Sequence, residues 1–409
     1  RFLILILIIL SPLIIIFRIM KGKEDPKRFK EKFSFKTEKK IKGKLIWFHG
    51  SSIGEILSVM PLIEKLEKNK NIKQILITSN TLSSSRIIKK FNLKKTVHQF
   101  FPIDSKIFIR KFLRYWKPSS VFFIESEIWP NMILEINKNK IPLILINARI
   151  TKKTFRKWIN FKRFSRSIFD KFDICLAQNE ESVKYLKKLG SSNVKKEGNL
   201  KFSNYEIVKK KKLDNKTLNF LKSKRILFCG LSTHAKEELF CAHLHRDLKN
   251  KIKNSLTIII PRHIDRVDDI INDLKIFNFN IHLHSSQKRI ERETEIYLVD
   301  SFGETEAFIR YCKIVFLGGS LIKHGGQNPL EAARLGCKVL YGPNIYNFKE
   351  VYKILNKYRI AFKIKSKRDA LIKIKNIIKK NKINNKVSKL NFIGNKILDN
   401  NFRTIQKYI

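Results

Sequence analysis

Two carboxylates follow a short apolar run near residue 120. Glu125 and Glu127 come directly after the apolar residues 121–124, and Trp129 and Pro130 follow them. Because the flanks are apolar, these carboxylates do not belong to a solvated charged surface. Carboxylates in such surroundings either titrate anomalously or hold a cation or a sugar hydroxyl. We therefore predict that Glu125 and Glu127 contribute to a functional site.

A third carboxylate, Glu55, follows a loop of small residues after the apolar run 45–48. The loop contains Gly50 and Gly54, and glycine lets a backbone approach a ligand closely. Glu55 is expected in the first turn of the next helix, where the positive end of the helix dipole stabilises an anion. Spacing alone leaves two interpretations open: a group that acts on a substrate, or an acid that only stabilises the helix start.

The second half of the chain has cationic and small polar residues at the ends of its apolar runs. Arg262 and His263 follow one run, and arginine suits phosphate or carboxylate because it can donate two parallel hydrogen bonds. Ser232 and Thr233 close another run and are typical helix-capping residues. The first pair predicts an anion-binding edge, and the second predicts a capped helix start.

The glycine-rich segment 318–326 leads into a further predicted helix. Asn328 suits the N-cap of this helix, Pro329 its first position and Glu331 its third. A glycine-rich loop that enters a helix can bind phosphate through free N–H groups, and Glu331 could accept hydrogen bonds from a ribose diol. The motifs GxxxxGK[ST] and GxGxxG are absent, so the sequence carries neither a P-loop nor a dinucleotide-binding fingerprint.

Apolar runs alternate with amphipathic stretches of helical period through both halves of the chain. We expect strands at 45–49, 74–79, 121–125, 142–147 and 173–178, and then at 225–230, 256–260, 295–300, 314–319 and 338–341. Apolar strands separated by helices indicate parallel sheets covered on both faces. The predicted class is α/β, with two doubly wound Rossmann-like domains in tandem. Ligands bind beyond the carboxyl ends of such strands, where the polar residues above should collect.

The predicted domain borders lie where this alternation pauses. Residues 208–215 are Lys-rich and have no apolar period, so we expect a linker there. It separates an N-terminal domain over 21–207 from a C-terminal domain over 216–409. We expect the helices of the tail from Lys367 to close the C-terminal domain.

The composition limits the class of protein. The 409 residues include 86 Lys+Arg and 35 Asp+Glu, a formal net charge of +51, while 43% are hydrophobic. That apolar fraction excludes a disordered polybasic chain. The excess charge suits an anionic partner, but Lys, Ile, Asn and Phe are enriched together along the whole chain, which favours compositional drift as its main cause. The five cysteines form no CxxC pair and no histidine pair has a companion at metal spacing, so we predict reduced thiols and no metal site.

The N-terminal residues 2–16 are almost wholly aliphatic, and four basic residues follow between 18 and 27. A helix of about 19 residues is about 28 Å long, enough to span a bilayer core. A cleaved signal peptide is the alternative, but the run does not end in the small residues typical of a cleavage site. We therefore expect an uncleaved transmembrane anchor over 1–20. The basic flank is C-terminal, which places the body on the cytoplasmic side.

Taken together, the motifs resemble those of the Kdo (3-deoxy-D-manno-octulosonic acid) transferases of lipopolysaccharide synthesis. The matching segments follow the family's order and cover nearly the whole chain. In the first half they are 47–55, 102–104, 125–131, 147–149, 177–180 and 198–202. In the second half they are 232–234, 261–263, 302–304, 318–320, 328–331, 342–343 and 347–348. Each segment is weak alone, whereas their order and spacing together are specific.

This resemblance implies an inverting, metal-independent glycosyltransferase of the GT-B type that needs no cofactor. It implies CMP-Kdo as the donor and the lipid A precursor (lipid IVA) as the acceptor. Glu55 matches the family's general base, and Glu125 and Lys201 match positions that support the transition state, with Glu127 beside them. The matches to CMP-binding positions are Ser232, Thr233, Arg262, His263, Phe302, Gly303, Glu304, Asn328, Pro329, Leu330 and Glu331.

The resemblance also implies a place at the cytoplasmic face of the inner membrane, where each basic residue near anionic lipid is worth roughly 1 kcal/mol. The near alternative is a GT-B enzyme that uses another nucleotide sugar. A nucleic-acid-binding protein is motivated by the charge alone, and the aromatic–basic interleaving it would need is absent. An inactive scaffold would have lost Glu55 or Arg262, yet both are present. The sequence indicates neither the number of sugars transferred nor the oligomeric state.

Overall fold

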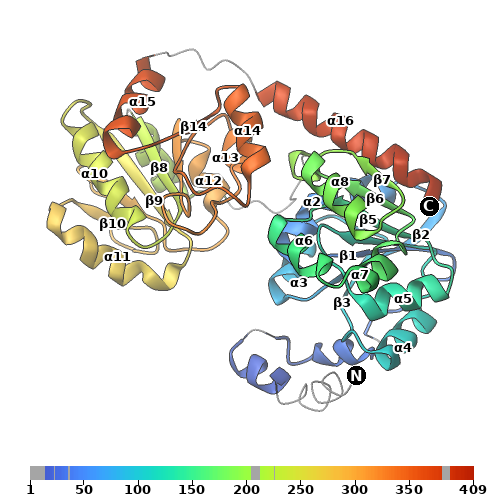
Figure 1. Cartoon of the computed structure of the whole chain (residues 1–409). Coiled ribbons are helices and arrows are strands. Elements are labelled where there is room, and N and C mark those ends of the chain that lie inside the picture. Colours follow the sequence, from blue (N-terminus) through green and yellow to red (C-terminus); the bar gives the residue numbers. More distant parts are fainter. Residues whose placement is uncertain (1–13, 23, 36, 204–211, 225, 380–386) are drawn as a thin grey trace. The chain divides into compact units, whose positions relative to one another are not determined.

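The structure is a computed structural model that describes residues 14–22, 24–35, 37–203, 212–224, 226–379 and 387–409. The chain divides into two compact units, each built around one parallel sheet (Figure 1). Unit 1 consists of Arg1–Lys209 together with Asn391–Ile409, and unit 2 consists of Lys210–Leu390.

The sheet of unit 1 has the strand order β3-β2-β1-β4-β5-β6-β7. Its strands are β1 (Lys44–His49), β2 (Ile72–Ser79), β3 (Thr96–Phe100), β4 (Ser120–Ile124), β5 (Leu143–Ala148), β6 (Ile174–Ala177) and β7 (Val194–Lys196). Side chains of β1 alternate between the faces, with Leu45 and Trp47 in one hydrophobic cluster and Ile46 and Phe48 in the other. The strand order reverses between β1 and β4, so a ligand crevice is expected at their carboxyl ends.

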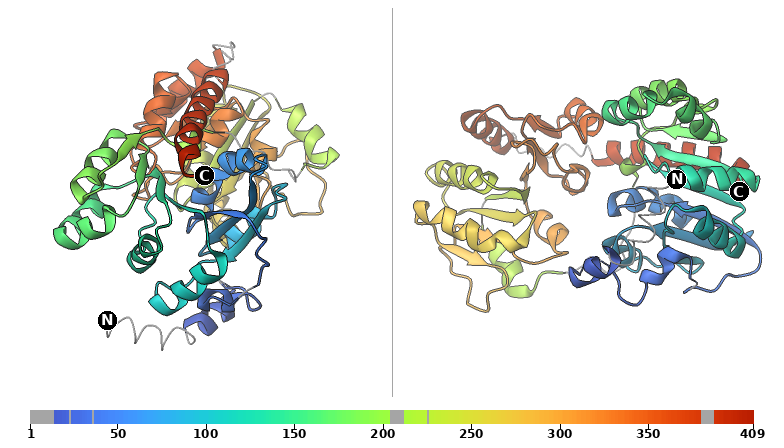
Figure 2. Two further views of the ribbon diagram at one scale, coloured as in Figure 1. Left: turned by 90° about the vertical axis from the view of Figure 1, so that its right-hand side faces the viewer. Right: turned by 60° about the horizontal axis from the view of Figure 1, so that its bottom comes forward.

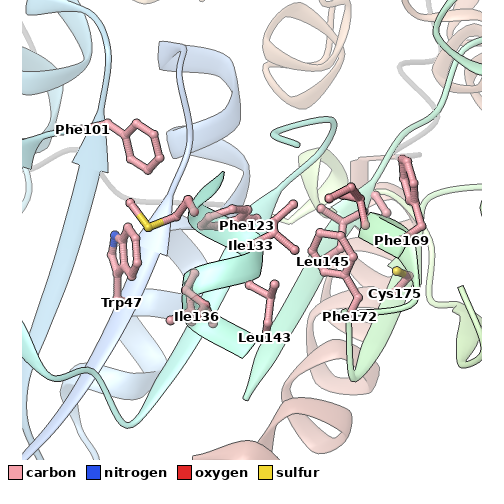
Figure 3. Packing of buried hydrophobic residues seen from close by; sticks show 14 of the residues in the cluster. Trp47, Phe101, Phe123, Ile133, Ile136, Leu143, Leu145, Phe169, Phe172 and Cys175 are labelled. Atoms are coloured by element: carbon pink, nitrogen blue, oxygen red, sulfur yellow. The ribbon is translucent and has the colours of Figure 1, made fainter. Parts of the chain in front are cut away.

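Helices cover both faces of this sheet. The helices between the first and last strands of unit 1 are α2 (Ile53–Glu67), α3 (Leu82–Ile88), α4 (Lys106–Trp116), α5 (Pro130–Lys138), α6 (Lys152–Ile159), α7 (Lys162–Phe169) and α8 (Glu180–Leu189). On one face, Trp47, Phe123 and Leu145 from three strands pack against Ile133 and Ile136 of α5 (Figure 3). Each such side chain contributes about 1.5–3 kcal/mol on burial, which fixes the strand ends that carry the polar loops.

The sheet of unit 2 has the strand order β10-β11-β9-β8-β12-β13-β14. Its strands are β8 (Ile226–Thr233), β9 (Ser255–Pro261), β10 (Ile281–Leu283), β11 (Ile296–Leu298), β12 (Ile314–Leu317), β13 (Lys338–Tyr341) and β14 (Ala361–Lys363). The helices are α9 (Asn215–Ser223), α10 (Glu237–Lys249), α11 (Val267–Leu274), α12 (Thr305–Ile309), α13 (Leu330–Arg334), α14 (Lys349–Lys357) and α15 (Lys367–Lys379). The strand order reverses between β8 and β12, where a second crevice is expected.

The predicted α/β class with two parallel sheets is confirmed. All ten predicted strands are present, and they are the five inner strands of each sheet. The four strands that the sequence did not indicate are β3, β7, β10 and β14, which are the edge strands. Three of these have only three residues each. A short edge strand buries little surface and therefore leaves almost no apolar pattern in the sequence.

The prediction that the whole tail closes the C-terminal domain is wrong for helix α16 (Val387–Ile405). Residues Asn391–Ile409 belong to unit 1, and both views in Figure 2 show the end of this red helix against the blue and green part of the chain. The reason is its apolar stripe, because Leu398 and Ile405 join the core cluster of unit 1 that contains Leu66 and Leu200.

Two predicted segments lie partly outside the described residues. Of the predicted anchor, residues 14–20 are described and helical, and Ile16, Phe17 and Met20 are exposed. In the described part of the chain, no helix is long and apolar enough to cross a bilayer. Of the predicted linker, residues 212–215 are described, and α9 begins at Asn215 with Asp214 as its N-cap.

Candidate active site

The carboxylates of unit 1 lie at the carboxyl ends of the neighbouring strands β1 and β4. His49 ends β1, and Glu125 follows the last residue of β4. The backbone of Glu125 is left-handed, with φ of +57°, a conformation that costs energy for a residue with a side chain. The chain therefore turns sharply at Glu125 instead of continuing the strand, and it brings Glu127 back toward β1.

Glu55 occupies the third position of α2 and forms a capping box with Ser52. Its Oε2 accepts hydrogen bonds from the backbone N–H of Ser51 at 2.6 Å and of Ser52 at 3.2 Å. Burial, followed by the nearby charges of Glu127 and Glu125, raises the pKa of Glu55 to about 7, although the two amides act against this. A carboxylate with this pKa can take up a proton near neutral pH, as a general base must.

Glu127 has the opposite environment, because three side-chain donors converge on its Oε2. They are Ser51 Oγ at 2.6 Å, Trp129 Nε1 at 2.8 Å and His49 Nε2 at 3.2 Å. Burial alone would raise the pKa of Glu127, but the hydrogen bond and charge of His49, with the other donors, lower it below its ordinary value. Glu127 is therefore a fixed negative charge beside Glu55.

His49 is fully buried, and a line of hydrogen bonds holds its ring. Trp47 Nε1 donates to Thr78 Oγ1 at 2.9 Å, and Thr78 Oγ1 lies 3.0 Å from His49 Nδ1. Nε2 donates its proton to Glu127, and Nδ1 lies within hydrogen-bond distance of both the hydroxyl and the carbonyl oxygen of Thr78. The ring also stacks on Phe101, with 3.7 Å between the ring centroids. These contacts hold the His49 ring in place, and the ring in turn holds the Glu127 carboxylate.

Glu125 pairs with Lys201, whose Nζ lies 2.5 Å from Glu125 Oε1. Both side chains are largely buried, with 18% of Lys201 and 8% of Glu125 exposed. Lys201 belongs to the single turn η2 (Leu200–Phe202), and the buried Asn147 holds this turn by accepting a hydrogen bond from the Leu200 amide at 3.0 Å. The structure thus brings together all four predicted catalytic residues, Glu55, Glu125, Glu127 and Lys201.

The predicted nucleotide-binding residues of unit 2 lie in loops at the carboxyl edge of its sheet. Arg262 and His263 are exposed just after β9. His234 lies beside them, with its ring centroid 6.0 Å from that of His263 and 4.3 Å from that of His324. Burial, followed by the charges of His324, His263 and Arg262, lowers the pKa of His234 to about 4. His234 is therefore uncharged near neutral pH, and Arg262 is the fixed positive charge that suits this edge to an anionic group.

The segments around Glu304 and Asn328 differ in exposure. Phe302 and Gly303 are exposed, whereas Glu304 is half-buried with its Oε2 3.2 Å from His284 Nε2. Asn328 is exposed and accepts a hydrogen bond from the amide of Leu330 at 3.1 Å. Helix α13 begins at Leu330 with Pro329 as its N-cap, one residue later than predicted. Among the last four predicted residues, Asn328 and Glu331 are exposed, and Pro329 and Leu330 are buried.

The predicted helix cap at Ser232 and Thr233 is wrong. Strand β8 runs through Thr233, and α10 begins at Glu237 after Lys236, a left-handed N-cap without a side-chain hydrogen bond. The strand continues because the side chain of Thr233 is fully buried, while Ser232 is half-buried and left-handed, with φ of +53°. The backbone of Ser232 packs closely against the loop after β12. A Cβ on Gly318 would lie 2.2 Å from the Ser232 carbonyl oxygen. The two loops can approach only because residue 318 is glycine.

The sequence predicted that the glycine-rich loop after β12 would offer its free amides to phosphate. In the structure, three of these amides are already hydrogen-bonded within the protein. The carboxylate of Glu237 accepts hydrogen bonds from the amides of Gly319 at 2.7 Å, Ser320 at 3.2 Å and Leu321 at 3.0 Å. It also accepts one from the amide of His234 at 3.0 Å. Burial raises the pKa of Glu237 above its ordinary value, although the amides of Gly319, Leu321 and His234 act against this. An internal carboxylate therefore occupies the nest in which phosphate was expected.

Sequence reasoning missed the roles of His49 and Glu237. His49 carried a signal, since it is a polar residue that ends an otherwise apolar strand. Glu237 carried none, because three of its amide partners lie 82–84 residues away. In the described part of the chain, no group of three or more His, Cys, Asp or Glu residues has the geometry to hold a metal ion. Metal independence remains a prediction.

The fold has known counterparts. Two α/β units, each with a parallel sheet, make up the GT-B fold. UDP-GlcNAc 2-epimerase from Neisseria meningitidis has this fold, with a TM-score of 0.57 and 14% identity over 89% of this chain and 99% of that one. The glycotransferase of kitacinnamycin has a TM-score of 0.55 and 9% identity over 90% of this chain and 100% of that one.

The family follows from sequence. A family model described as 3-deoxy-D-manno-octulosonic-acid transferase matches residues 27–204. The chain is 33% identical over 384 residues to the 3-deoxy-D-manno-octulosonic acid transferase of Rickettsia prowazekii. The aligned region covers 92% of this chain and 83% of that protein. The chain belongs to the family of 3-deoxy-D-manno-octulosonic acid (Kdo) transferases and is a glycosyltransferase. The resemblance drawn from the motifs is confirmed.

Proposed function

We propose that this protein transfers Kdo from CMP-Kdo to a hydroxyl of the lipid A precursor, with inversion at the anomeric carbon and without a metal ion. The observation that carries the proposal is the environment of Glu55. Its carboxylate is held by two amides at a strand end and has a pKa of about 7, while Glu125 is already paired with Lys201. Among the three carboxylates, Glu55 is thus the one suited to accept a proton.

In the proposed reaction, Glu55 takes the proton of the acceptor hydroxyl as its oxygen attacks the anomeric carbon of Kdo. The bond from that carbon to the phosphate oxygen breaks, and CMP leaves with the electron pair. A single displacement of this kind inverts the anomeric configuration. Lys201 offsets negative charge on the sugar carboxylate or on the departing phosphate, and Glu125 holds Lys201 in place. Glu127 keeps its charge because three donors hold it.

Unit 2 would hold the donor. Arg262 supplies positive charge for the phosphate of CMP, and the rings of His263 and the uncharged His234 lie beside it. Glu331 is exposed at the start of α13, where it can accept hydrogen bonds from ribose hydroxyls. Because Glu237 occupies the amides of the glycine-rich loop, side chains rather than those amides would bind the phosphate.

The acceptor is a phosphorylated glycolipid, so the enzyme must work at a membrane surface. We place it at the cytoplasmic face of the inner membrane. The support is the net charge of +51 together with the exposed apolar residues Ile16, Phe17 and Met20 near the start of the described chain. Flotation with vesicles tests this placement: binding to vesicles rich in anionic lipid and not to neutral ones is expected, and equal binding to both would contradict it.

The decisive experiment incubates the full chain with CMP-Kdo and purified lipid A precursor. Mass spectrometry of the lipid should show the addition of Kdo and count the sugars. Parallel reactions with UDP-sugars test the near alternative, because transfer from those donors alone would replace this proposal. Reaction in the presence of EDTA tests metal independence, and NMR of the anomeric centre in the product tests inversion. A product that retains the donor's configuration would exclude single displacement.

A further inference from the structure

Helix α16 packs directly on the turn that carries Lys201. The turn η2 (Leu200–Phe202) and residues Asn391–Ile409 both belong to unit 1, although nearly two hundred residues separate them in the sequence. Leu398 and Leu200 lie in the same buried cluster. The helix is therefore part of the support of the candidate active site.

The point of closest approach is Gly394. A Cβ at this position would lie 2.1 Å from the carbonyl oxygen of Phe202 and 3.2 Å from the Cα of Ser203. Real side chains do not come so close to backbone, so only glycine permits this contact. Glycine in the middle of a helix is unfavourable, which means that the close contact, rather than helix formation, requires it here.

Three further contacts hold the same segment against α16. Ser203 Oγ donates to the carbonyl oxygen of Gly394 at 3.1 Å, and Thr404 Oγ1 donates to Glu197 Oε1 at 3.2 Å. Ile397 packs where a side chain on Gly198 would lie, with its Cγ1 2.9 Å from the ideal Cβ position. Residues 197, 198, 202 and 203 are thus all in contact with one helix, on both sides of Lys201.

The segment 197–203 determines where the ammonium group of Lys201 lies. Leu200 is fixed by Asn147 on one side of it, and Phe202 is fixed by Gly394 on the other. Between them, Lys201 Nζ reaches Glu125 Oε1 at 2.5 Å. A shift of the Phe202 backbone away from α16 would therefore move the lysine relative to the carboxylate.

We propose that α16 is a positioning element of the active site: the contact of Gly394 with the backbone of Phe202 sets the place of Lys201 against Glu125. This inference rests on the proposed function, because it assigns Lys201 a role in the same reaction. Gly394 touches no reacting group and acts only through Lys201.

The test compares Gly394→Ala with two controls on the same helix. Asn395→Ala changes the exposed neighbouring residue, so it also introduces alanine but reaches no part of η2. Ile405→Ala removes a fully buried side chain at the far end of α16, eleven residues from Gly394, and so destabilises the helix packing away from Phe202. Each variant is compared with the wild type by melting temperature, by kcat and KM for CMP-Kdo, and by the pH profile of kcat/KM.

Gly394→Ala is expected to lower kcat about 10- to 100-fold with little change in KM for CMP-Kdo, since misplacement of a positioned group costs factors of this size. Asn395→Ala should resemble the wild type. Ile405→Ala should lower the melting temperature while kcat per folded molecule stays near normal. An equal loss of kcat in Ile405→Ala and Gly394→Ala would show that α16 contributes stability alone, and it would overturn the proposal.

The pH profile gives a readout that loss of stability would not move. The groups that face Glu55 are Glu125 and Glu127, and these in turn face Lys201 and His49. When the ammonium moves away from Glu125, the negative charge beside Glu55 is less compensated, so the pKa of Glu55 rises. The acid limb of the profile in Gly394→Ala should therefore shift to higher pH, and an unshifted limb would contradict the positioning role.

A titration of Glu55 by ¹³C NMR measures the same shift without any transfer reaction. A higher pKa of Glu55 in Gly394→Ala than in the wild type would support the positioning of Lys201 even if CMP-Kdo proved not to be the donor. Conversely, normal turnover in Lys201→Met, together with loss of turnover in Glu55→Gln, would leave the proposed function standing and remove this inference. The two proposals can thus fail separately.

Discussion

Glu55 in unit 1 and Glu237 in unit 2 occupy comparable places, since each lies in the first turn of a helix that follows a parallel strand. Burial raises the pKa of both carboxyls. Their neighbours differ, however. Glu237 is only 1% exposed and accepts four amide hydrogen bonds, whereas Glu55 accepts two and faces the carboxylates of Glu125 and Glu127.

Position in the fold therefore does not decide what a carboxylate does. Glu237 has its hydrogen-bonding capacity filled by backbone from a distant loop, so it serves structure. Glu55 can take up a proton near neutral pH because the charges of Glu127 and Glu125 disfavour its ionised form. The same residue type at the same kind of helix start is a structural anchor in one unit and a candidate base in the other.

The largest effect is expected from Glu55→Gln. The amide can still accept hydrogen bonds from Ser51 and Ser52, but it cannot accept the acceptor's proton. Turnover should fall by about 10²- to 10⁴-fold, the range for loss of a general base, while binding of CMP measured by calorimetry stays normal. Turnover close to that of the wild type would show that Glu55 is not the general base. Glu55 and Glu237 would then not differ in function.

The same variant should also change how stability depends on pH. A carboxyl with a raised pKa contributes its full stability below the unfolded value of 4.5, and that contribution is lost as the pH rises through about 7. At pH 8, Glu55→Gln should therefore be more stable than the wild type by about 3 kcal/mol, with little difference at pH 4.5. Urea unfolding at the two pH values measures this. Glu181→Gln, an exposed first-turn glutamate of α8, should show no such difference.

Glu237→Gln should have the opposite effect on stability. The new NH₂ group would face backbone N–H donors, and at least one buried amide of the loop 319–321 would lose its acceptor. The loss of stability should be about 2 kcal/mol, the cost of leaving a buried donor unsatisfied. Thermal unfolding of this variant is compared with Glu350→Gln, an exposed first-turn glutamate of α14 in the same unit. An equal melting temperature in both would show that Glu237 is not an anchor.

The smallest effect is expected from Glu127→Gln. This change removes the nearby charge that contributes most to the raised pKa of Glu55 after burial. The acid limb of the kcat/KM profile should move to lower pH, by about one pH unit for the loss of one close like charge. A limb that stays in place or moves upward would show that Glu127 does not act on Glu55 electrostatically.

Much of this arrangement could be predicted from residue patterns, and the limits have physical causes. Inner strands are apolar on both faces, so the sequence pattern indicates them. Edge strands such as β7 and β10 have only three residues each, so the pattern does not indicate them. Glu55 and Glu125 could be assigned because their local surroundings are informative. The pairing of Glu125 with Lys201 depends on a left-handed backbone and on contacts of Asn147 and Gly394, which are properties of distant segments.

The discontinuity of unit 1 has a consequence for the synthesis of the protein. A chain emerging from the ribosome folds its early segments first. The segment up to Lys209 already contains the sheet, Glu55 and Lys201, but the helix that fixes the lysine's turn belongs to Asn391–Ile409. Translation must therefore pass through the whole of Lys210–Leu390 before that support exists. A partly made chain can carry the acidic residues of the site, but its lysine gains its final place only after unit 2 has been synthesised.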